Sequence, residues 1–124
     1  PIIDVKIREV VYILGEVKNP GAYTFKDGMT LAAILATAEG PTRDAKLRNV
    51  LVIRGYNESE RNPKVVVANI GRMMKKGDLT QNIYLQGGDI IFLPSTVISN
   101  VNYFVKQLGP ILDLVMFPGK VVFP

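Results

Sequence analysis

Two residue types on which much enzyme and metal chemistry depends are missing from this sequence. It contains no histidine and no cysteine. A Cys/His zinc site, a thiol nucleophile, a thiolate redox pair and a histidine-based triad therefore cannot be built from its side chains. The serines do not lie in the Gly-x-Ser-x-Gly pattern of a nucleophile elbow; they are Ser59, Ser95 and Ser99. This inventory predicts a protein that is not an enzyme and uses no cofactor or metal.

Two remaining patterns bear on catalysis or ligand binding. Glu58, Glu60 and Arg61 form a polar stretch, and paired carboxylates can hydrolyse glycosides. Tyr56 is the one aromatic residue beside them, and the sequence has no tryptophan to stack on a sugar, which favours a solvated turn. The glycine pair at 87–88 is not followed by Gly-Lys-Ser/Thr, so a phosphate loop is not expected.

Basic residues exceed acidic residues by a formal charge of +4. One local concentration is predicted to contact an anionic polymer or the acidic groups of a partner; it comprises Arg43, Lys46, Arg48 and Arg54. Because Arg48 and Arg54 are separated by an even number of positions, strand alternation would place them on one face of an extended segment. A second concentration consists of Arg72, Lys75 and Lys76. The alternative is that all of these side chains form an ordinary solvated surface.

Nucleic-acid binding is not expected despite this charge. The basic residues are scattered from Lys6 to Lys120, and the five tyrosines and five phenylalanines show no pattern typical of an RNA-recognition motif.

Apolar spacing and turn residues predict the elements that must position these groups. Strands are expected at 2–8, 10–17, 22–25, 49–54, 64–68 and 89–93, with a brief one at 83–85. Helices are expected at 31–38, where Thr30 is the N-cap and Gly40 ends the helix, and at 70–76. A small mixed sheet that grips one helix is the β-grasp arrangement, which belongs to the α+β class.

The segment from Val97 to Phe117 predicts an amphipathic helix. One side is apolar and includes Phe104, Val105, Leu108, Leu112 and Val115; the other carries Ser99, Asn102, Lys106 and Asp113. Its length as a helix, roughly 32 Å, is close to the hydrocarbon thickness of a bilayer. Pro110 predicts either a kink or a break into two helices.

Two placements of this helix are open. As a spanning helix in an oligomeric ring, it would turn the apolar side chains toward lipid and the polar side chains toward a wet lumen. As an interfacial or domain-packing helix, it would cover its apolar side with a membrane surface or with protein.

Four motifs in the same order resemble a soluble-ligand-binding β-grasp (SLBB) domain over residues 10–95. They are the run 11–17 with Asn19-Pro20-Gly21 and Tyr23, the helix from Thr30 to Gly40, Val52-Ile53-Arg54-Gly55, and the run 88–94. The sequence is most similar to the SLBB domain of outer-membrane polysaccharide export proteins of the Wza type. Glu39 departs from the family, which more often has glycine at this point of the helix end.

The resemblance implies a non-enzymatic part of a capsular or exopolysaccharide export channel. It implies a homo-oligomeric ring that conducts polysaccharide, contact with an inner-membrane polysaccharide copolymerase, and a location in the periplasm and outer membrane of a Gram-negative bacterium. The domains expected are a strand remnant at 1–9, the SLBB domain at 10–95, the amphipathic helix at 96–117 and a tail at 118–124. The alternative is a stand-alone ligand-binding β-grasp module.

Overall fold

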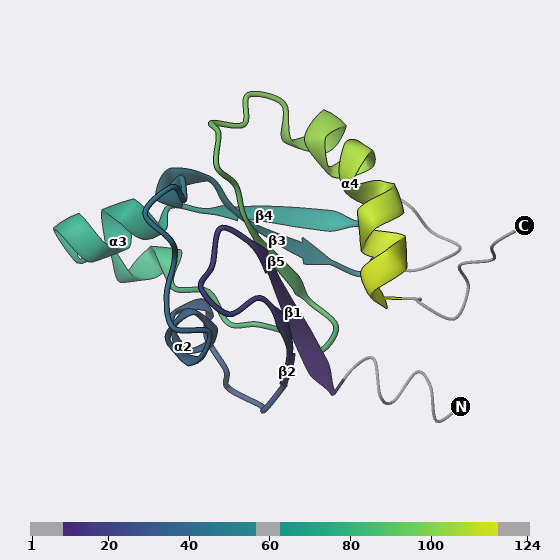
Figure 1. Ribbon diagram of the computed structural model, residues 1–124. Coiled ribbons are helices and arrows are strands. Elements are labelled where there is room, and N and C mark those ends of the chain that lie inside the picture. Colours follow the sequence, from purple (N-terminus) through teal and green to yellow (C-terminus); the bar gives the residue numbers. More distant parts are fainter. Residues whose placement is uncertain (1–8, 57–62, 117–124) are drawn as a thin grey trace, which may run out of the picture.

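A computed structural model describes residues 9–56 and 63–116 of the chain (Figure 1). These residues form a five-stranded sheet in the order β2-β1-β5-β3-β4. The strands are β1 (Val10–Gly15), β2 (Gly21–Thr24), β3 (Val50–Arg54), β4 (Lys64–Ala68) and β5 (Ile90–Leu93). β1 and β5 are parallel, and the other neighbouring pairs are antiparallel. This mixed sheet with its helices confirms the predicted α+β, β-grasp fold.

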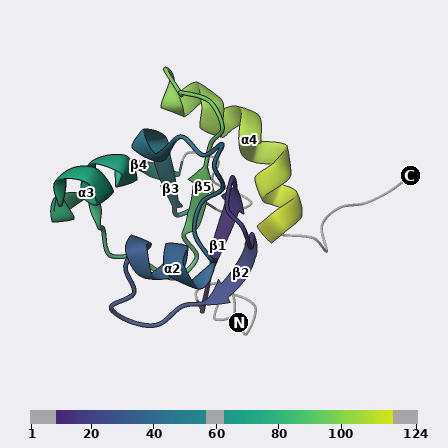
Figure 2. The ribbon, with the colours of Figure 1, turned by 60° about the vertical axis from the view of Figure 1, so that its left-hand side comes forward.

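The helical elements connect the strands and cover the sheet. They are α2 (Leu31–Thr37), α3 (Ile70–Lys76) and α4 (Val101–Met116), with short 3₁₀ turns η1 (Leu47–Asn49) and η2 (Leu79–Gln81). Figure 2 shows the sheet between α2 on one side and α4 on the other. The expected strand at 2–8, the polar stretch with Glu58, Glu60 and Arg61, and the tail at 118–124 lie outside the described residues.

The helix α2 begins and ends close to the predicted positions. The Thr30 hydroxyl accepts a hydrogen bond from the Ala33 amide at 3.3 Å, as an N-cap should. At the other end, Glu39 and Gly40 both have positive φ, 68° and 85°, although the sequence pointed to the glycine alone. The brief strand expected at 83–85 is reduced to an isolated bridge between Thr30 and Tyr84.

Two apolar clusters lie on opposite faces of the sheet. On β3, Val50 and Val52 belong to the cluster under α2, and Leu51 and Ile53 belong to the cluster under α4. Alternate residues of a strand face opposite sides of a sheet, so this strand is buried on both faces. β3 therefore contributes side chains to both cores.

A close backbone approach joins β1 to β5. An ideal Cβ added to Gly15 would lie 2.2 Å from the Leu93 carbonyl oxygen, and its φ of 89° is itself unfavourable for other residues. The amide of the next residue, Glu16, donates to that same carbonyl at 2.8 Å. Glycine is required here because a side chain would displace the end of β5.

Candidate functional site

The connection between α2 and β3 is held firmly at one end of the sheet. The Thr42 amide donates to the Glu16 carbonyl at 3.0 Å, and the Lys46 amide donates to the Pro94 carbonyl at 2.8 Å. The Thr42 hydroxyl also donates to the Glu16 carboxylate at 2.7 Å. From this anchored backbone the connection presents three exposed basic side chains, those of Arg43, Lys46 and Arg48.

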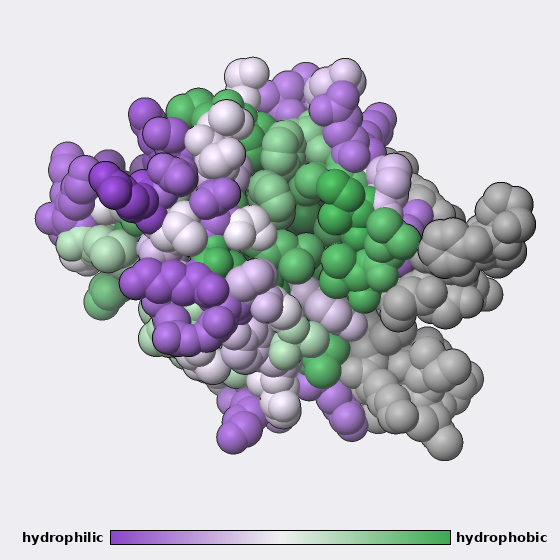
Figure 3. Space-filling view, in the orientation of Figure 1, coloured by the Kyte–Doolittle hydropathy of each residue, from purple (hydrophilic) through white to green (hydrophobic). Residues whose placement is uncertain are grey.

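The helix α3 brings the second basic concentration to the same end of the molecule. Leu47 of η1 packs in one apolar cluster with Ile70 and Met73 of α3, and an ideal Cβ on Gly71 would lie 3.7 Å from the Leu47 Cβ. We call the combined surface the basic end; it consists of Arg43, Lys46, Arg48, Arg72, Lys75 and Lys76, all exposed. In Figure 3 strongly hydrophilic side chains gather over α3 and its surroundings.

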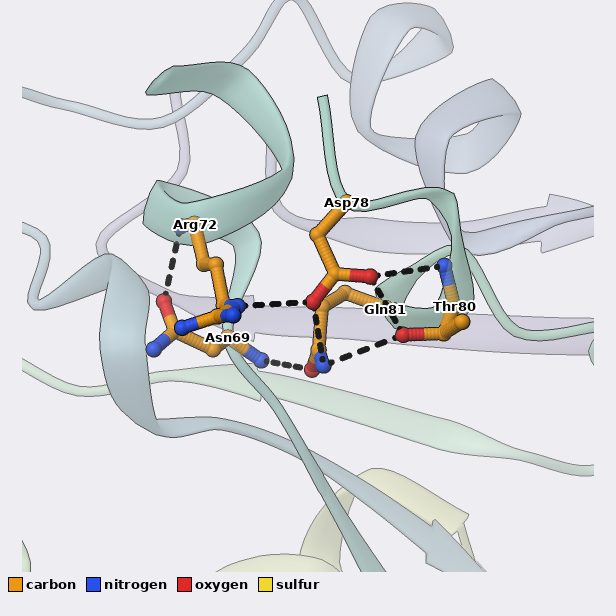
Figure 4. A network of polar contacts seen from close by, with 5 residues as sticks. All are labelled: Asn69, Arg72, Asp78, Thr80 and Gln81. Carbon is orange, nitrogen blue, oxygen red and sulfur yellow. Dashed lines mark hydrogen bonds and ion pairs between the residues drawn. The ribbon is translucent and has the colours of Figure 1, made fainter. Parts of the chain in front are cut away.

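A network of polar side chains fixes α3 against η2 (Figure 4). The side-chain oxygen of Asn69 caps α3 by accepting a hydrogen bond from the Arg72 backbone amide at 2.9 Å. The backbone amide of Asn69 donates to Gln81 Oε1 at 2.8 Å. Arg72 Nε donates to Asp78 Oδ2 at 2.8 Å, and Asp78 in turn caps η2 by accepting from the Thr80 amide at 3.2 Å. Arg72 therefore braces the turn as well as adding charge to the basic end.

Hydrogen bonding makes Asp78 an unusually strong acid. The hydroxyl of Thr80 contributes most, with smaller contributions from Arg72 and Gln81, and together they lower the pKa of Asp78 to about 2. Its carboxylate is thus charged at neutral pH and offsets part of the positive charge of Arg72.

The structure separates Arg54 from the other predicted contact residues. Its guanidinium pairs with Asp89, with Nη2 at 3.1 Å from Oδ2 and Nε at 3.2 Å from Oδ1, and Nη2 also donates to the Tyr84 carbonyl at 2.8 Å. Asp89 is only 1% exposed and accepts a further bond from the Gln86 amide at 2.8 Å. This ion pair braces the turn before β5, so Arg54 is positioned for a structural role.

The expected shared face of Arg48 and Arg54 is wrong for a local reason. Arg48 lies in the 3₁₀ turn η1, so strand alternation does not extend to it, whereas Arg54 is the last residue of β3. The two side chains therefore belong to opposite ends of the strand. The basic end includes Arg72, Lys75 and Lys76 and does not include Arg54. The closeness of these three residues in the sequence was the feature from which their role could have been predicted.

The model of one protein family, described as the SLBB domain, matches residues 9–93. That span covers more than half of the chain and includes the whole sheet. The chain belongs to the SLBB domain family. The basic end lies inside the matched SLBB region, and α4 follows it.

The apolar side of α4 packs on the face of the SLBB sheet that lies opposite α2. Val105, Leu108 and Leu112 are buried in a cluster with Leu51 and Ile53 of β3. Phe104 and Val115 pack at the margin of the same cluster, and the rings of Phe104 and Phe92 have centroids 5.5 Å apart. The spanning placement assigned these five side chains to lipid, but in this structure they contact protein. The arrangement is that of the domain-packing alternative.

The polar side of α4 is not one continuous stripe. Ser99 precedes the helix and is exposed, and Asn102 and Lys106 on the helix are exposed as well, but Asp113 is half-buried and accepts a hydrogen bond from the Tyr56 hydroxyl. The assignment of all four to a wet lumen therefore fails for Asp113 in this structure.

The helix also differs in extent from the prediction. It begins at Val101 and not at Val97, because Asn100 caps it by accepting from the Tyr103 amide at 3.0 Å. It continues through Pro110 without a break. Within the described part of the chain, no helix has both the length and the apolar character needed to cross a bilayer.

Among residues 9–56 and 63–116, no group of three or more carboxylates is arranged to hold a metal ion. The paired carboxylates Glu58 and Glu60 fall outside this part of the chain.

Proposed function

We propose that this SLBB domain is a non-enzymatic component of a machinery that exports a capsular or extracellular polysaccharide. Its basic end would contact acidic groups of the polymer or of a partner protein. Family membership supports the binding role, since SLBB domains are ligand-binding domains found in polysaccharide export proteins.

The observation that carries this proposal is the joining of two basic segments at one end of the sheet. Arg43, Lys46 and Arg48 lie on an anchored connection, and Lys75 and Lys76 lie on a helix that packs against it. Carboxylate or phosphate groups repeated along a polymer would meet several of these charges at once, and a preformed surface reduces the entropy cost of binding.

The proposal includes the setting in which such a domain would work. We place it in the periplasm and at the outer membrane of a Gram-negative bacterium, within a homo-oligomeric ring that contacts an inner-membrane polysaccharide copolymerase. In that ring the SLBB domains would surround the path of the hydrated polymer.

Binding to two defined polymers tests the role of the basic end. The chain should bind alginate, a polymer of uronic acids, and should not bind neutral dextran. Reversing Arg43, Lys46 and Arg48 to glutamate should weaken alginate binding by about tenfold or more, and added salt should weaken binding of the wild type. The matched control reverses three exposed lysines away from the basic end, Lys26, Lys64 and Lys106. Equal losses in both triple variants would contradict the proposal.

A second candidate is a stand-alone ligand-binding module. The packing of α4 on its own sheet favours it, because the apolar side of the helix is already covered within one chain. Two measurements distinguish the export component from the stand-alone module. Sedimentation of the purified chain gives its oligomeric state, and the amount of surface polysaccharide is measured on cells that lack the gene. Monomers, together with normal polysaccharide on cells that lack the gene, would support the module and contradict the exporter.

A further inference from the structure

The turn from α3 to η2 exposes two large apolar side chains on a projecting part of the molecule. Met74 is 65% exposed and Leu79 is 74% exposed. Figures 1 and 2 both show α3 at the outer end of the fold, away from α4. We propose that this tip docks on an anionic lipid surface, with Met74 and Leu79 entering the headgroup region and Lys75 and Lys76 contacting lipid phosphates.

The tip is preorganised for such a contact. The bonds of Asn69 and Arg72 to Gln81 and Asp78 hold α3 and η2 together. Gly77, with φ of 69°, ends α3 in the left-handed conformation, and its amide donates to the Met73 carbonyl at 2.9 Å. Because these bonds and the helix end at Gly77 fix the backbone of the tip, little backbone entropy is lost when its exposed side chains contact a surface.

The arrangement of charge favours a lipid surface. Between residues 69 and 82 the basic side chains are Arg72, Lys75 and Lys76, and the acidic side chain is Asp78, which pairs with Arg72. Figure 3 shows a small hydrophobic area directly beside strongly hydrophilic surface at this end of the molecule. Basic residues that flank exposed apolar side chains are the pattern of peripheral binding to anionic membranes.

The shape of the tip points the same way. A projecting tip can enter the interface of a bilayer, whose headgroups move apart, whereas a protein partner would need a pocket of matching form. Anionic phospholipid headgroups supply the complementary charge to Lys75 and Lys76. The inference does not depend on polysaccharide binding, which was assigned to the basic end as a whole.

The absence of tryptophan from the chain permits a direct test. Leu79→Trp, in the full chain, should show a blue shift of emission with vesicles of phosphatidylglycerol and phosphatidylethanolamine, and quenching by brominated lipid. Leu114→Trp is the matched control, because Leu114 is 52% exposed on α4 at the other side of the fold. No shift at position 79, or equal shifts at both positions, would overturn the proposal.

Charge variants give a second, independent measurement. Co-sedimentation with the same vesicles should fall roughly 20-fold when Lys75 and Lys76 are both replaced by alanine, and vesicles of phosphatidylcholine alone should bind little protein. The control pair Lys26→Ala and Lys64→Ala should retain wild-type binding. Leu79→Ser should weaken vesicle binding several-fold and leave alginate binding unchanged, which separates this inference from the proposed function. Vesicle binding that is insensitive to both Leu79→Ser and the Lys75/Lys76 pair would contradict it.

Discussion

Glu39 and Gly15 both adopt the positive-φ backbone conformation that favours glycine, and one of them is not a glycine. Glu39 occupies the left-handed region with φ of 68°, at a point where the family more often has glycine. A side chain there costs about 1 kcal/mol or more because its Cβ crowds the following carbonyl. At Gly15, by contrast, the approach of the Leu93 carbonyl leaves no room for a side chain at all.

The first prediction concerns this strain. Glu39→Gly should raise the free energy of unfolding by about 0.5–1 kcal/mol, since relief of strain exceeds the added entropy of the unfolded chain. Urea denaturation followed by circular dichroism measures the change. Ala36→Gly, at an exposed position inside α2, is the control and should lower stability by about 1 kcal/mol. A loss of stability in Glu39→Gly would mean that the glutamate side chain contributes a contact that outweighs its strain.

The second prediction concerns the acidic residue of the α3–η2 turn. Asp78 has a folded-state pKa of about 2, below its ordinary value of 3.8, so its contribution to stability is fully present above about pH 4. That contribution should disappear as the pH falls from about 4 to about 2. Asp78→Asn should therefore flatten the pH dependence of unfolding in this window, and Asp27→Asn, at an exposed position, should not. An NMR titration that finds Asp78 near its ordinary pKa would refute the assignment.

At the scale of elements, the least predictable feature is the position of α4. Its periodicity correctly showed an apolar side, and the structure covers that side with the sheet. The Tyr56 hydroxyl, just beyond β3, lies 3.1 Å from the Gly109 carbonyl and also donates to Asp113, which adds polar contacts to the apolar ones. The helix is therefore held at its middle by residues far away in the sequence.

The third prediction tests this docking. Leu112 lies on α4 and is fully buried against the sheet, so Leu112→Ala should lower the free energy of unfolding by about 2–5 kcal/mol. Leu114, two residues later, is 52% exposed, and Leu114→Ala should change stability by less than about 0.5 kcal/mol. Similar effects of the two substitutions in denaturant unfolding would show that α4 does not pack in this way in solution.

For the molecule as a whole, the two cores share one sheet. Because β3 contributes alternate side chains to both clusters, unfolding of this strand would disrupt both cores at once. The described residues should therefore unfold as one cooperative unit, as small domains usually do.

The fourth prediction follows from this coupling. Leu35→Ala, on the α2 side, should cost about 2–5 kcal/mol and shift the same transition as Leu112→Ala on the α4 side. Far-ultraviolet circular dichroism and tyrosine fluorescence should report coincident unfolding curves in both variants. Two separate transitions in Leu112→Ala, with the first confined to helical signal, would show that α4 unfolds on its own.

The sequence determined the elements and the class of fold. Alternation within strands, the Thr30 cap and the turn glycines are local features, and the missing histidine and cysteine exclude chemistry that needs an imidazole or a thiol. These features depend on neighbours a few residues apart, which a sequence shows directly.

Only the tertiary structure decided which surface each element meets. Periodicity shows that a helix has an apolar side, but burial against a sheet and burial in lipid select the same residues, so the sequence could not place α4. The sequence likewise does not show which group a charged side chain will contact. Arg54 pairs with Asp89 because the strand order puts β3 beside β5. Lys75 lies with Lys46 at the basic end because α3 packs on η1. These pairings depend on strand order and helix docking, which contacts between distant residues establish.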